Sequence, residues 1–395
     1  MSVPILGIES SCDETAAAVV RGGRDILSSV VASQDDVHRK YGGVVPELAS
    51  REHLRRIVPV VREALERAGL GFDGLAAIGV TRGPGLIGSL LVGYTYGQAL
   101  AAALGKPLVP VNHLEGHVHA VFLEAQQKRA PENGTENGSA SAAENAAPLP
   151  ELPAVCLIVS GGHTVLYDVR AANAGVAAPA GYPAFRCTYA RIGATRDDAA
   201  GEAYDKVAKL LALGYPGGPV LDQLASHGNP LAVQFTPPNT RGNPLDFSFS
   251  GTKTAVLRHI RHNPAFEKEI AERAEALRRG VRRAADLLPM ATAATLDLVA
   301  SFQRAVVRDL VQRTLAAAEE RAARCVLVSG GVAANSELRE TFHRECARRA
   351  LPVFFPSRPL STDNAAMIAA AAYPRLLAGE VATEGVGAEA NFPLA

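Results

Sequence analysis

Apolar runs and short polar turns alternate along the chain in a way that predicts an α/β fold. The apolar runs 3–9 and 16–20 flank the polar turn 10–15, which predicts a strand, a tight turn and a second strand. Residues 51–68 have helical spacing instead. Their apolar stripe is Leu54, Ile57, Val58, Val61 and Leu65. Later strands that lead into turns or helices are predicted in the segments 75–83, 107–125, 154–169, 324–346 and 352–379. Further helices are predicted at 201–213, 258–290 and 292–321. Strands that alternate with helices in this way indicate an α/β architecture.

The chain divides into two related halves around a polar segment. The strand–turn–strand pattern of 154–169 repeats that of the N-terminus, although few residues are identical. Between them, 126–153 consists of Ala, Asn, Glu, Gly, Pro and Ser with almost no large apolar residue, so we expect a flexible insertion and a domain boundary. We therefore expect a first lobe at 1–125 and a second at 154–364, with part of the C-terminal helix in 365–395 packing back on the first.

One uncharged stretch, 83–105, is long enough to cross a bilayer. It is rich in glycine and also carries Pro84, Ser89, Thr95 and Gln98, whereas a membrane span is richer in Leu, Ile and Phe. We therefore expect a buried helix that other elements approach closely.

Composition limits the classes of protein that remain. The 395 residues are 48% hydrophobic and 20% charged, which excludes a disordered chain, a collagen-like fibre and a disulfide-stabilised miniprotein. Lys and Arg (40) balance Asp and Glu (40), so a nucleic-acid partner would have to be bound by a local patch. Five scattered cysteines without a C-x-x-C pair suit a reducing compartment. The N-terminus has no basic segment typical of a signal peptide, and we expect a cytoplasmic protein.

Short turns of mostly small or polar residues follow predicted strands at 10–15, 160–164 and 329–335. Only the last two contain glycine themselves, but all three place small residues where the backbone leaves a strand. Such turns let backbone N–H groups converge on an anion, although a short turn alone explains each of them equally well. Together they predict two phosphate loops and an adenosine loop in a nucleotide cleft between two lobes. The chain has neither G-x-x-x-x-G-K-[ST] nor G-x-G-x-x-G, so neither a P-loop NTPase nor a Rossmann dehydrogenase is indicated.

His113 and His117 form a second candidate site. At i and i+4 of a helix, two imidazoles share one face and can chelate a divalent metal, although a pair of solvated or capped histidines has the same spacing. Asp363 is a candidate for the third ligand. Glu115 lies about 200° around the helix from His113, which argues against a zinc protease. His119 is off the metal face and is expected to be structural.

The helix 201–213 carries a further candidate, Asp205, which could accept hydrogen bonds from a ribose. The alternative is an ordinary charged face on which Glu202 pairs with Lys206. Nearby, the glycine pair Gly217 and Gly218 permits close backbone approach, and Asp222 follows one helical turn later. Lys253, in a loop, could meet a phosphate or lie on the surface.

Seven motifs carry a resemblance to a known family. In chain order they are GIESSCDET, NHLEGH, LIVSGGHT, AAGEAYDKVAKLL with GYPGGPVLD, DFSFSGTKTA, SGGVAANSELR and STDNAAMIA. This series resembles the signature of the tRNA N6-adenosine threonylcarbamoyltransferase family, once misnamed O-sialoglycoprotein endopeptidases. The motifs extend over nearly the whole chain except 126–153 and the region around 262–290, which is longer than the usual pattern.

The resemblance implies an actin-like, sugar-kinase-like ATPase fold with two lobes and a nucleotide cleft. It implies an acyltransferase that moves a threonylcarbamoyl group from threonylcarbamoyl-adenylate to N6 of the adenosine 3′ to the anticodon, in tRNAs that read codons starting with A, with release of AMP. One divalent metal per subunit, Fe2+ or alternatively Zn2+, would be held by His113, His117 and Asp363. The adenylate or nucleotide would lie against Ile158, Val159, Ser160, Gly161, Gly162, Asp205, Gly218, Asp222 and Asn335. The implied partners are tRNA, a smaller paralogous subunit and a P-loop ATPase, with no membrane.

The residues do not identify the general base, and Glu9 and Asp13 in the first turn are the candidates. Because the chain has no net charge, we expect Arg-rich surface between 255 and 283, or a partner subunit, to supply the positive field for tRNA. Three alternatives remain: a small-molecule kinase, a metalloprotease and a non-catalytic regulatory ATPase fold. A kinase or a regulatory fold would not explain the histidine site, and a metalloprotease would not explain the glycine turns.

Overall fold

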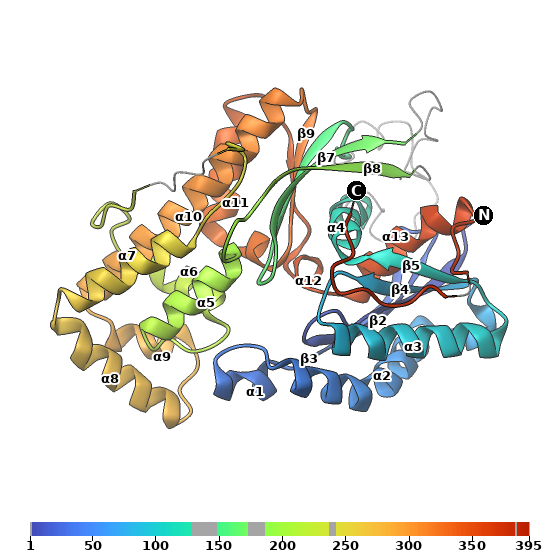
Figure 1. Ribbon diagram of the computed structural model, residues 1–395, viewed down its shortest axis with the longest axis horizontal. Coiled ribbons are helices and arrows are strands. Elements are labelled where there is room, and N and C mark those ends of the chain that lie inside the picture. Colours follow the sequence, from blue (N-terminus) through green and yellow to red (C-terminus); the bar gives the residue numbers. More distant parts are fainter. Residues whose placement is uncertain (1, 128–147, 173–185, 237–241, 384, 395) are drawn as a thin grey trace, which may run out of the picture.

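The computed structural model describes residues 2–127, 148–172, 186–236, 242–383 and 385–394. Two five-stranded sheets form the centres of two lobes, and helices cover both faces of each sheet (Figure 1). The predicted α/β class is therefore confirmed.

The first sheet is built entirely from the first third of the chain. Its strand order is β3-β2-β1-β4-β5. The strands are β1 (Pro4–Glu9), β2 (Glu14–Arg21), β3 (Asp25–Ser33), β4 (Ala77–Gly83) and β5 (Leu108–Asn112). β1, β2 and β3 pair antiparallel, whereas β4 and β5 run parallel to β1.

The second sheet repeats this plan. Its order is β10-β9-β6-β7-β8. The strands are β6 (Ala154–Val159), β7 (Thr164–Ala171), β8 (Cys187–Ala194), β9 (Cys325–Ser329) and β10 (Val353–Phe354). The first three pair antiparallel, and the last two run parallel to β6. Since both sheets place their first strand in the centre, with the second and third on one side and the fourth and fifth on the other, the halves of the chain are structural repeats.

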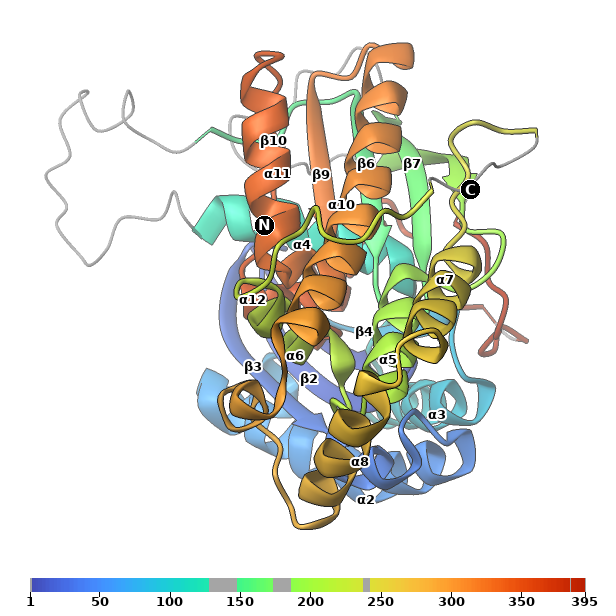
Figure 2. The ribbon, with the colours of Figure 1, turned by 90° about the vertical axis from the view of Figure 1, so that its left-hand side faces the viewer.

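The helices connect and cover these strands. Those of the first half are α1 (Asp35–His38), η1 (Arg39–Tyr41), α2 (Pro46–Ala68), η2 (Phe72–Gly74), α3 (Ile87–Leu104) and α4 (His113–Gln127). Between β8 and β9 lie α5 (Ala200–Leu210), α6 (Gly217–Ala225), α7 (Ser250–Arg261), α8 (Ala265–Arg278), α9 (Ala284–Leu287), η4 (Leu288–Met290) and α10 (Ala293–Glu320). The last are η5 (Gly331–Ala334), α11 (Ser336–Ala347), α12 (Arg358–Ser361) and α13 (Ala365–Leu377). In Figure 2, α10 and α11 run beside β9 in the second lobe.

Two helices cross between the lobes and lie between the sheets. α4 follows β5 of the first sheet, but its Leu114, Val118 and Phe122 are buried against the second sheet. α13 follows the second sheet, but its alanine-rich body is buried against the first. Alanine allows a helix to approach a sheet closely, and at Gly7 of β1 a Cβ atom would collide with the carbonyl oxygen of Ala365. This exchange holds the N-terminal ends of α4 and α13 at the junction of the lobes.

Some predicted details are wrong. In α2, Leu54 and Val58 are 66% and 39% exposed, because the buried stripe instead contains His53, Ile57, Val60, Val61, Ala64 and Leu65. The continuous helical region expected at 258–290 is divided among the end of α7, α8 and α9. The strands β3 and β8 were not predicted. Most of the expected insertion at 126–153 lies outside the described residues.

Among the described residues, one helix, α3, is long and apolar enough to cross a membrane by length and composition. It packs against α2 and the first sheet through Leu90, Gly93 and Tyr94, while Ile87 and Leu91 are about half exposed. The expected close approach is confirmed at Gly93, where a Cβ atom would collide with the Ser10 hydroxyl. The expected burial applies to one face of the helix only.

Candidate active site between the two lobes

The candidate metal donors lie at the starts of the two crossing helices. His113 is the first residue of α4, directly after β5, and His117 follows one turn later on the same face. The Asn112 side chain accepts a hydrogen bond from the Leu114 N–H at 2.9 Å, which fixes this first turn. Asp363 precedes Asn364, whose side chain caps α13 by accepting from the Met367 N–H at 3.0 Å.

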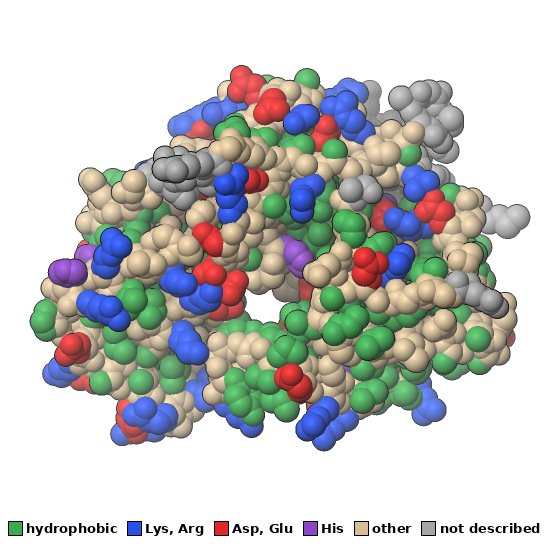
Figure 3. All heavy atoms as spheres, in the orientation of Figure 1, with side chains coloured by type: hydrophobic (Ala, Val, Ile, Leu, Met, Phe, Trp, Pro, Cys, Tyr) green, Lys and Arg blue, Asp and Glu red, His purple; other side chains and the backbone are tan. Residues whose placement is uncertain are grey.

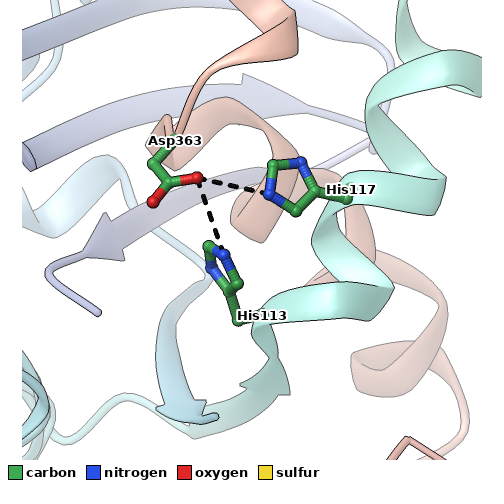
Figure 4. Close-up of side chains that lie close together, drawn as sticks. All are labelled: His113, His117 and Asp363. Carbon is green, nitrogen blue, oxygen red and sulfur yellow. Dashed lines mark ion pairs between the residues drawn. The ribbon is translucent and has the colours of Figure 1, made fainter. Parts of the chain in front are cut away.

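The fold brings these three side chains together (Figure 4), although 246 positions separate His117 and Asp363 in the sequence. Asp363 Oδ1 lies 3.2 Å from His117 Nε2 and 3.6 Å from His113 Nε2. One ligand atom from each residue lies within 4.8 Å of the other two. The imidazole centroids of His113 and His117 are 4.7 Å apart. His117 is fully buried, while Asp363 retains 18% exposure of its side chain, which leaves an approach for a ligand.

The donors fit a divalent metal ion. His117 is fully buried, yet neither of its ring nitrogens makes a hydrogen bond within the described structure, an arrangement that costs free energy unless the nitrogens have another partner. Metal–ligand bonds of about 2.0–2.2 Å allow one ion to bridge donors separated by 3.2 and 3.6 Å. Burial lowers the pKa of His113, but Asp363 and Glu9 outweigh it and raise that pKa to about 9. Burial raises the pKa of Asp363, but the imidazoles outweigh it and hold that pKa well below its usual range.

Glu9 orients His113. The Glu9 side chain is fully buried at the end of β1, and its Oε2 lies 3.0 Å from His113 Nδ1. The Thr81 hydroxyl donates to the same oxygen at 2.7 Å, and the Ser11 N–H donates to Oε1. A hydrogen bond from Nδ1–H to a carboxylate leaves the Nε2 lone pair directed at a metal. Both oxygens of Glu9 are thus engaged in holding the first turn and His113.

Glu115 and His119 of α4 lie outside the group of candidate metal donors. Glu115 Oε2 accepts hydrogen bonds from Arg375 Nε at 2.8 Å and is ion-paired with its NH2 group at 2.8 Å, so the prediction that Glu115 points away from the metal face is confirmed. His119 is buried, lies near the Tyr189 hydroxyl, and is outside the group of candidate metal donors. Burial and the nearby Arg375 lower its pKa to about 3, so it is a neutral core residue.

A third histidine, His163, faces the donors from the second lobe. It lies in the turn between β6 and β7, and its ring centroid is 6.1 Å from that of His113. The turn is held by hydrogen bonds from Ser160 N–H to the His163 carbonyl at 2.7 Å and from His163 N–H to the Ser160 hydroxyl at 3.1 Å. Burial, followed by His113 and His117, lowers the pKa of His163 to about 4, so its imidazole is neutral near pH 7.

The predicted phosphate-binding turn and Asp205 lie on adjoining elements. Ile158 and Val159 are buried in β6, and Ser160, Gly161 and Gly162 form the turn that follows. Gly201 at the start of α5 donates to the Ser160 carbonyl at 3.1 Å, and a Cβ atom at Gly201 would collide with this turn. Asp205, one turn further along α5, accepts from the Gly217 N–H at 2.7 Å and orients the glycine pair at the start of α6, where Gly218 has open space beside it.

Asp222 and Asn335 meet through α10 and α11. Asp222 accepts from the Ser336 hydroxyl at 2.7 Å and from Gln303 Nε2 at 3.2 Å. Asn335 caps α11 by accepting from the Leu338 N–H at 2.9 Å, and its Nδ2 donates to Gln303 Oε1 at 2.8 Å. Gln303 therefore bridges two predicted nucleotide-binding residues. Gln303 lies in the middle of a long helix without a recognisable motif, so the sequence carries no signal for it.

Acidic groups from both lobes face one another in the cleft. Asp13 follows β1, Asp35 begins α1, and Asp205 belongs to the second lobe. Burial, with contributions from Asp13 and Asp35, raises the pKa of Asp205 to about 6. An anionic substrate in this cleft therefore needs compensating positive potential, which the backbone N–H groups of the turns and a divalent ion can supply.

Lys206 and Lys253 both contact the carboxylate of Asp198. Lys206 Nζ lies 2.7 Å from Asp198 Oδ1, and Lys253 Nζ lies 3.2 Å from Asp198 Oδ2. The predicted pair between Glu202 and Lys206 is confirmed at 2.9 Å. Lys253 lies in α7 and not in the expected loop, and its ion pair joins α7 to the segment before α5, next to the phosphate-binding turn.

The duplicated sheets, with two crossing helices and a cleft between the lobes, define the class of actin-like, two-lobed ATPase folds, as expected. Consistent with this class, the structure of HypF from T. kodakarensis superimposes with a TM-score of 0.51 at 15% identity, over 98% of this chain and 49% of that one. This likeness concerns the fold alone.

The family is shown by sequence comparison. The profile of the family described as tRNA N6-adenosine threonylcarbamoyltransferase matches residues 25–134 and 137–370. Proteins of that name from Koribacter versatilis and Clostridium perfringens are 55% and 45% identical to this chain, over 99% of its length and 98% of theirs. The chain belongs to this family and is a transferase that modifies tRNA. The match includes 262–290 and all but two residues of 126–153, so it extends further than the motifs predicted.

Proposed function

We propose that the protein transfers the threonylcarbamoyl group from threonylcarbamoyl-adenylate to N6 of the adenosine 3′ to the anticodon, in tRNAs that read codons starting with A, and releases AMP. The observation that carries this proposal is the family match over the whole chain, together with His113, His117 and Asp363 at the junction of the lobes. In the reaction, an N–C bond to the carbamoyl carbon forms and the bond from that carbon to the adenylate oxygen breaks. The N6 amine also loses a proton.

The donor set supports a metal requirement. Two imidazoles and one carboxylate that leave coordination positions open are typical of Fe2+ centres, and Zn2+ accepts the same ligands, so we propose Fe2+ with Zn2+ as the alternative. When bound, such an ion supplies Lewis-acid polarisation of a carbamoyl or phosphate oxygen. Glu9 holds His113 in the tautomer and orientation that this coordination needs.

We place the adenylate across the second lobe. The phosphate would lie against the N–H groups of the turn 160–162, and the ribose would lie near Asp205 and the start of α6. The adenosine end would reach the network of Asp222, Gln303 and Asn335, which three different helices hold in position. Positioning by these groups keeps the carbamoyl carbon near the metal donors, and AMP is a good leaving group.

The contacts of Glu9 weigh against it as the base that accepts the N6 proton. Glu9 is fully buried and both its oxygens accept hydrogen bonds from residues of the first lobe. Asp13 lies near Asp35 and Asp205 at the face of the cleft, and it stays a candidate for the base. His163 faces the donors with a neutral imidazole, and we assign it contact with the transferred group.

We further infer, from family membership, that tRNA is bound together with a smaller paralogous subunit and a P-loop ATPase partner, and that the protein works in the cytoplasm.

The test is to supply threonylcarbamoyl-adenylate, the candidate partners and tRNA, and to quantify threonylcarbamoyladenosine by mass spectrometry of digested nucleosides. We expect the modified nucleoside from this mixture and none from a tRNA with guanosine in place of the target adenosine. Phosphate transfer from ATP to a small molecule without any modified nucleoside would support the kinase alternative instead.

A further inference from the structure

Basic side chains in the region expected to contact tRNA differ in how far they are neutralised. On α8, Arg278 and Arg279 both pair with Glu275, and Lys268 is ion-paired with Glu272. After α8, Arg283 is paired with Asp286. Figure 3 shows Lys, Arg, Asp and Glu side chains intermixed over this end of the second lobe. Much of the Arg-rich surface at 255–283 is therefore electrically compensated and has little field to attract a polyanion.

The end of α7 is different. From Phe247 to Phe266 the chain contains no Asp or Glu. Arg258 and Arg261 are exposed, and neither guanidinium forms an ion pair within the part of the chain that the structure describes. The two residues are three positions apart, so they project from one face of the helix, while Val256 and Ile260 bury the opposite face. We call this exposed pair, Arg258 and Arg261, the α7 basic face.

α7 is also fixed relative to the catalytic cleft. Asp197 accepts hydrogen bonds from the Phe249 N–H at 2.8 Å and the Ser250 hydroxyl at 2.9 Å, so the start of α7 is bound to the segment before α5. Lys253 adds the ion pair with Asp198. That same segment leads into Gly201, which contacts the phosphate-binding turn. Because Asp197 and Asp198 both hold α7, the helix can present its basic face at a constant position relative to the cleft.

We propose that the α7 basic face binds phosphate groups of the tRNA backbone and so helps to position the substrate at the cleft between the lobes. This inference rests on the proposed function and names a surface for it. The chain has no net charge, so its attraction for a tRNA has to come from local cations that no carboxylate compensates. Arg258 and Arg261 meet that condition, and arginine matches phosphate geometry well. The paired arginines of α8 do not meet it.

The test compares two double variants of the full-length chain that lose the same formal charge. Arg258→Ala/Arg261→Ala removes the α7 basic face, and Arg278→Ala/Arg279→Ala removes two exposed arginines from neighbouring α8. Binding of an unmodified tRNA is measured by fluorescence anisotropy over a series of KCl concentrations. Each lost phosphate contact reduces the slope of log K against log salt by about 0.7–0.9. The α7 variant should therefore lose about 1.4–1.8 of slope, or roughly 25- to 60-fold in affinity near 0.1 M salt.

A lysine variant and a vesicle-binding measurement complete the experiment. Arg258→Lys/Arg261→Lys keeps the charge and should retain most of the slope, which excludes a folding defect as the cause of the loss. The inference is overturned if the α7 and α8 variants lose slope equally, or if the α7 alanine variant binds tRNA like the wild type. It is also overturned if that variant loses binding only to vesicles of an anionic phospholipid, which would assign the surface to a membrane.

The transfer assay of the wild type distinguishes this inference from the proposed function. If the α7 variant loses salt dependence of tRNA binding but the wild type forms no threonylcarbamoyladenosine, the tRNA-binding role of the α7 basic face is supported and the proposed function is refuted. Transfer by the wild type with an unchanged slope in the α7 variant would support the function and refute the surface.

Discussion

Glu9→Gln tests the claim that a buried carboxylate prepares His113 for a metal. Glu9 accepts from three donors, the Thr81 hydroxyl and His113 Nδ1–H at Oε2 and the Ser11 N–H at Oε1. A glutamine retains one acceptor oxygen, so its NH2 group must face at least one of these donors. Leaving a buried donor unsatisfied costs about 1–3 kcal/mol of unfolding free energy. Loss of a carboxylate that orients a ligating histidine typically reduces metal affinity by about 10- to 100-fold.

The assay is an anaerobic Fe2+ titration of the metal-free protein, with thermal unfolding measured in parallel. The matched control is Glu115→Gln, which alters another buried carboxylate on the same helix, paired with Arg375. We expect both variants to be less stable and only Glu9→Gln to bind Fe2+ more weakly. Equal Fe2+ affinity in Glu9→Gln and wild type, or an equal loss in both variants, would refute the orienting role.

Three further substitutions test other parts of the site. His163→Asn should reduce the rate of threonylcarbamoyl transfer at unchanged metal content by mass spectrometry, and an unchanged rate would refute the proposed contact between His163 and the transferred group. Asp205→Asn should stabilise the free protein, because the folded pKa of about 6 lies above the ordinary 3.8 and ionisation therefore costs stability as pH rises between these values. In thermal unfolding, the difference in unfolding free energy between Asp205→Asn and wild type should grow up to about pH 6, to at most about 3 kcal/mol, and then stay constant. A difference that shrinks as pH rises would contradict this prediction. Gly7→Ala should lower the free energy of unfolding by about 1–3 kcal/mol, because its Cβ atom would meet the Ala365 carbonyl, and a neutral effect in denaturant unfolding would show that α13 is not packed directly on β1.

The sequence predicts the class of fold well because strands and helices have different hydrophobic periods. Alternation of the two gave the α/β class, and the similarity of 154–169 to the N-terminus indicated the repeated lobes. The periodicity identified Ile57, Val61 and Leu65 as buried but did not define the edges of the buried face of α2. Leu54 and Val58 fit the helical spacing as well as His53 and Val60 do. Only the position of the first sheet shows that His53 and Val60 are the buried residues. Tertiary packing decides between stripes that the sequence leaves equivalent.

The candidate site divides in a similar way. The spacing of His113 and His117 predicts a shared helix face by itself, because one turn separates them. The position of Asp363 beside them depends on α4 and α13 exchanging between the lobes, which no local pattern shows. Gln303 was not predicted for the same reason, since its partners Asp222 and Asn335 come from two other helices.

The most direct test of the account combines threonylcarbamoyl transfer with the three metal donors. Incorporation of labelled threonine into tRNA is measured for wild type, His113→Ala, His117→Ala and Asp363→Ala, with metal content determined for each. His119→Gln is the control, because His119 is a buried histidine of the same helix outside the donor group. We expect the three donor variants to lose both the metal and the transfer activity, and His119→Gln to retain both. Full transfer by the donor variants at reduced metal content would contradict it.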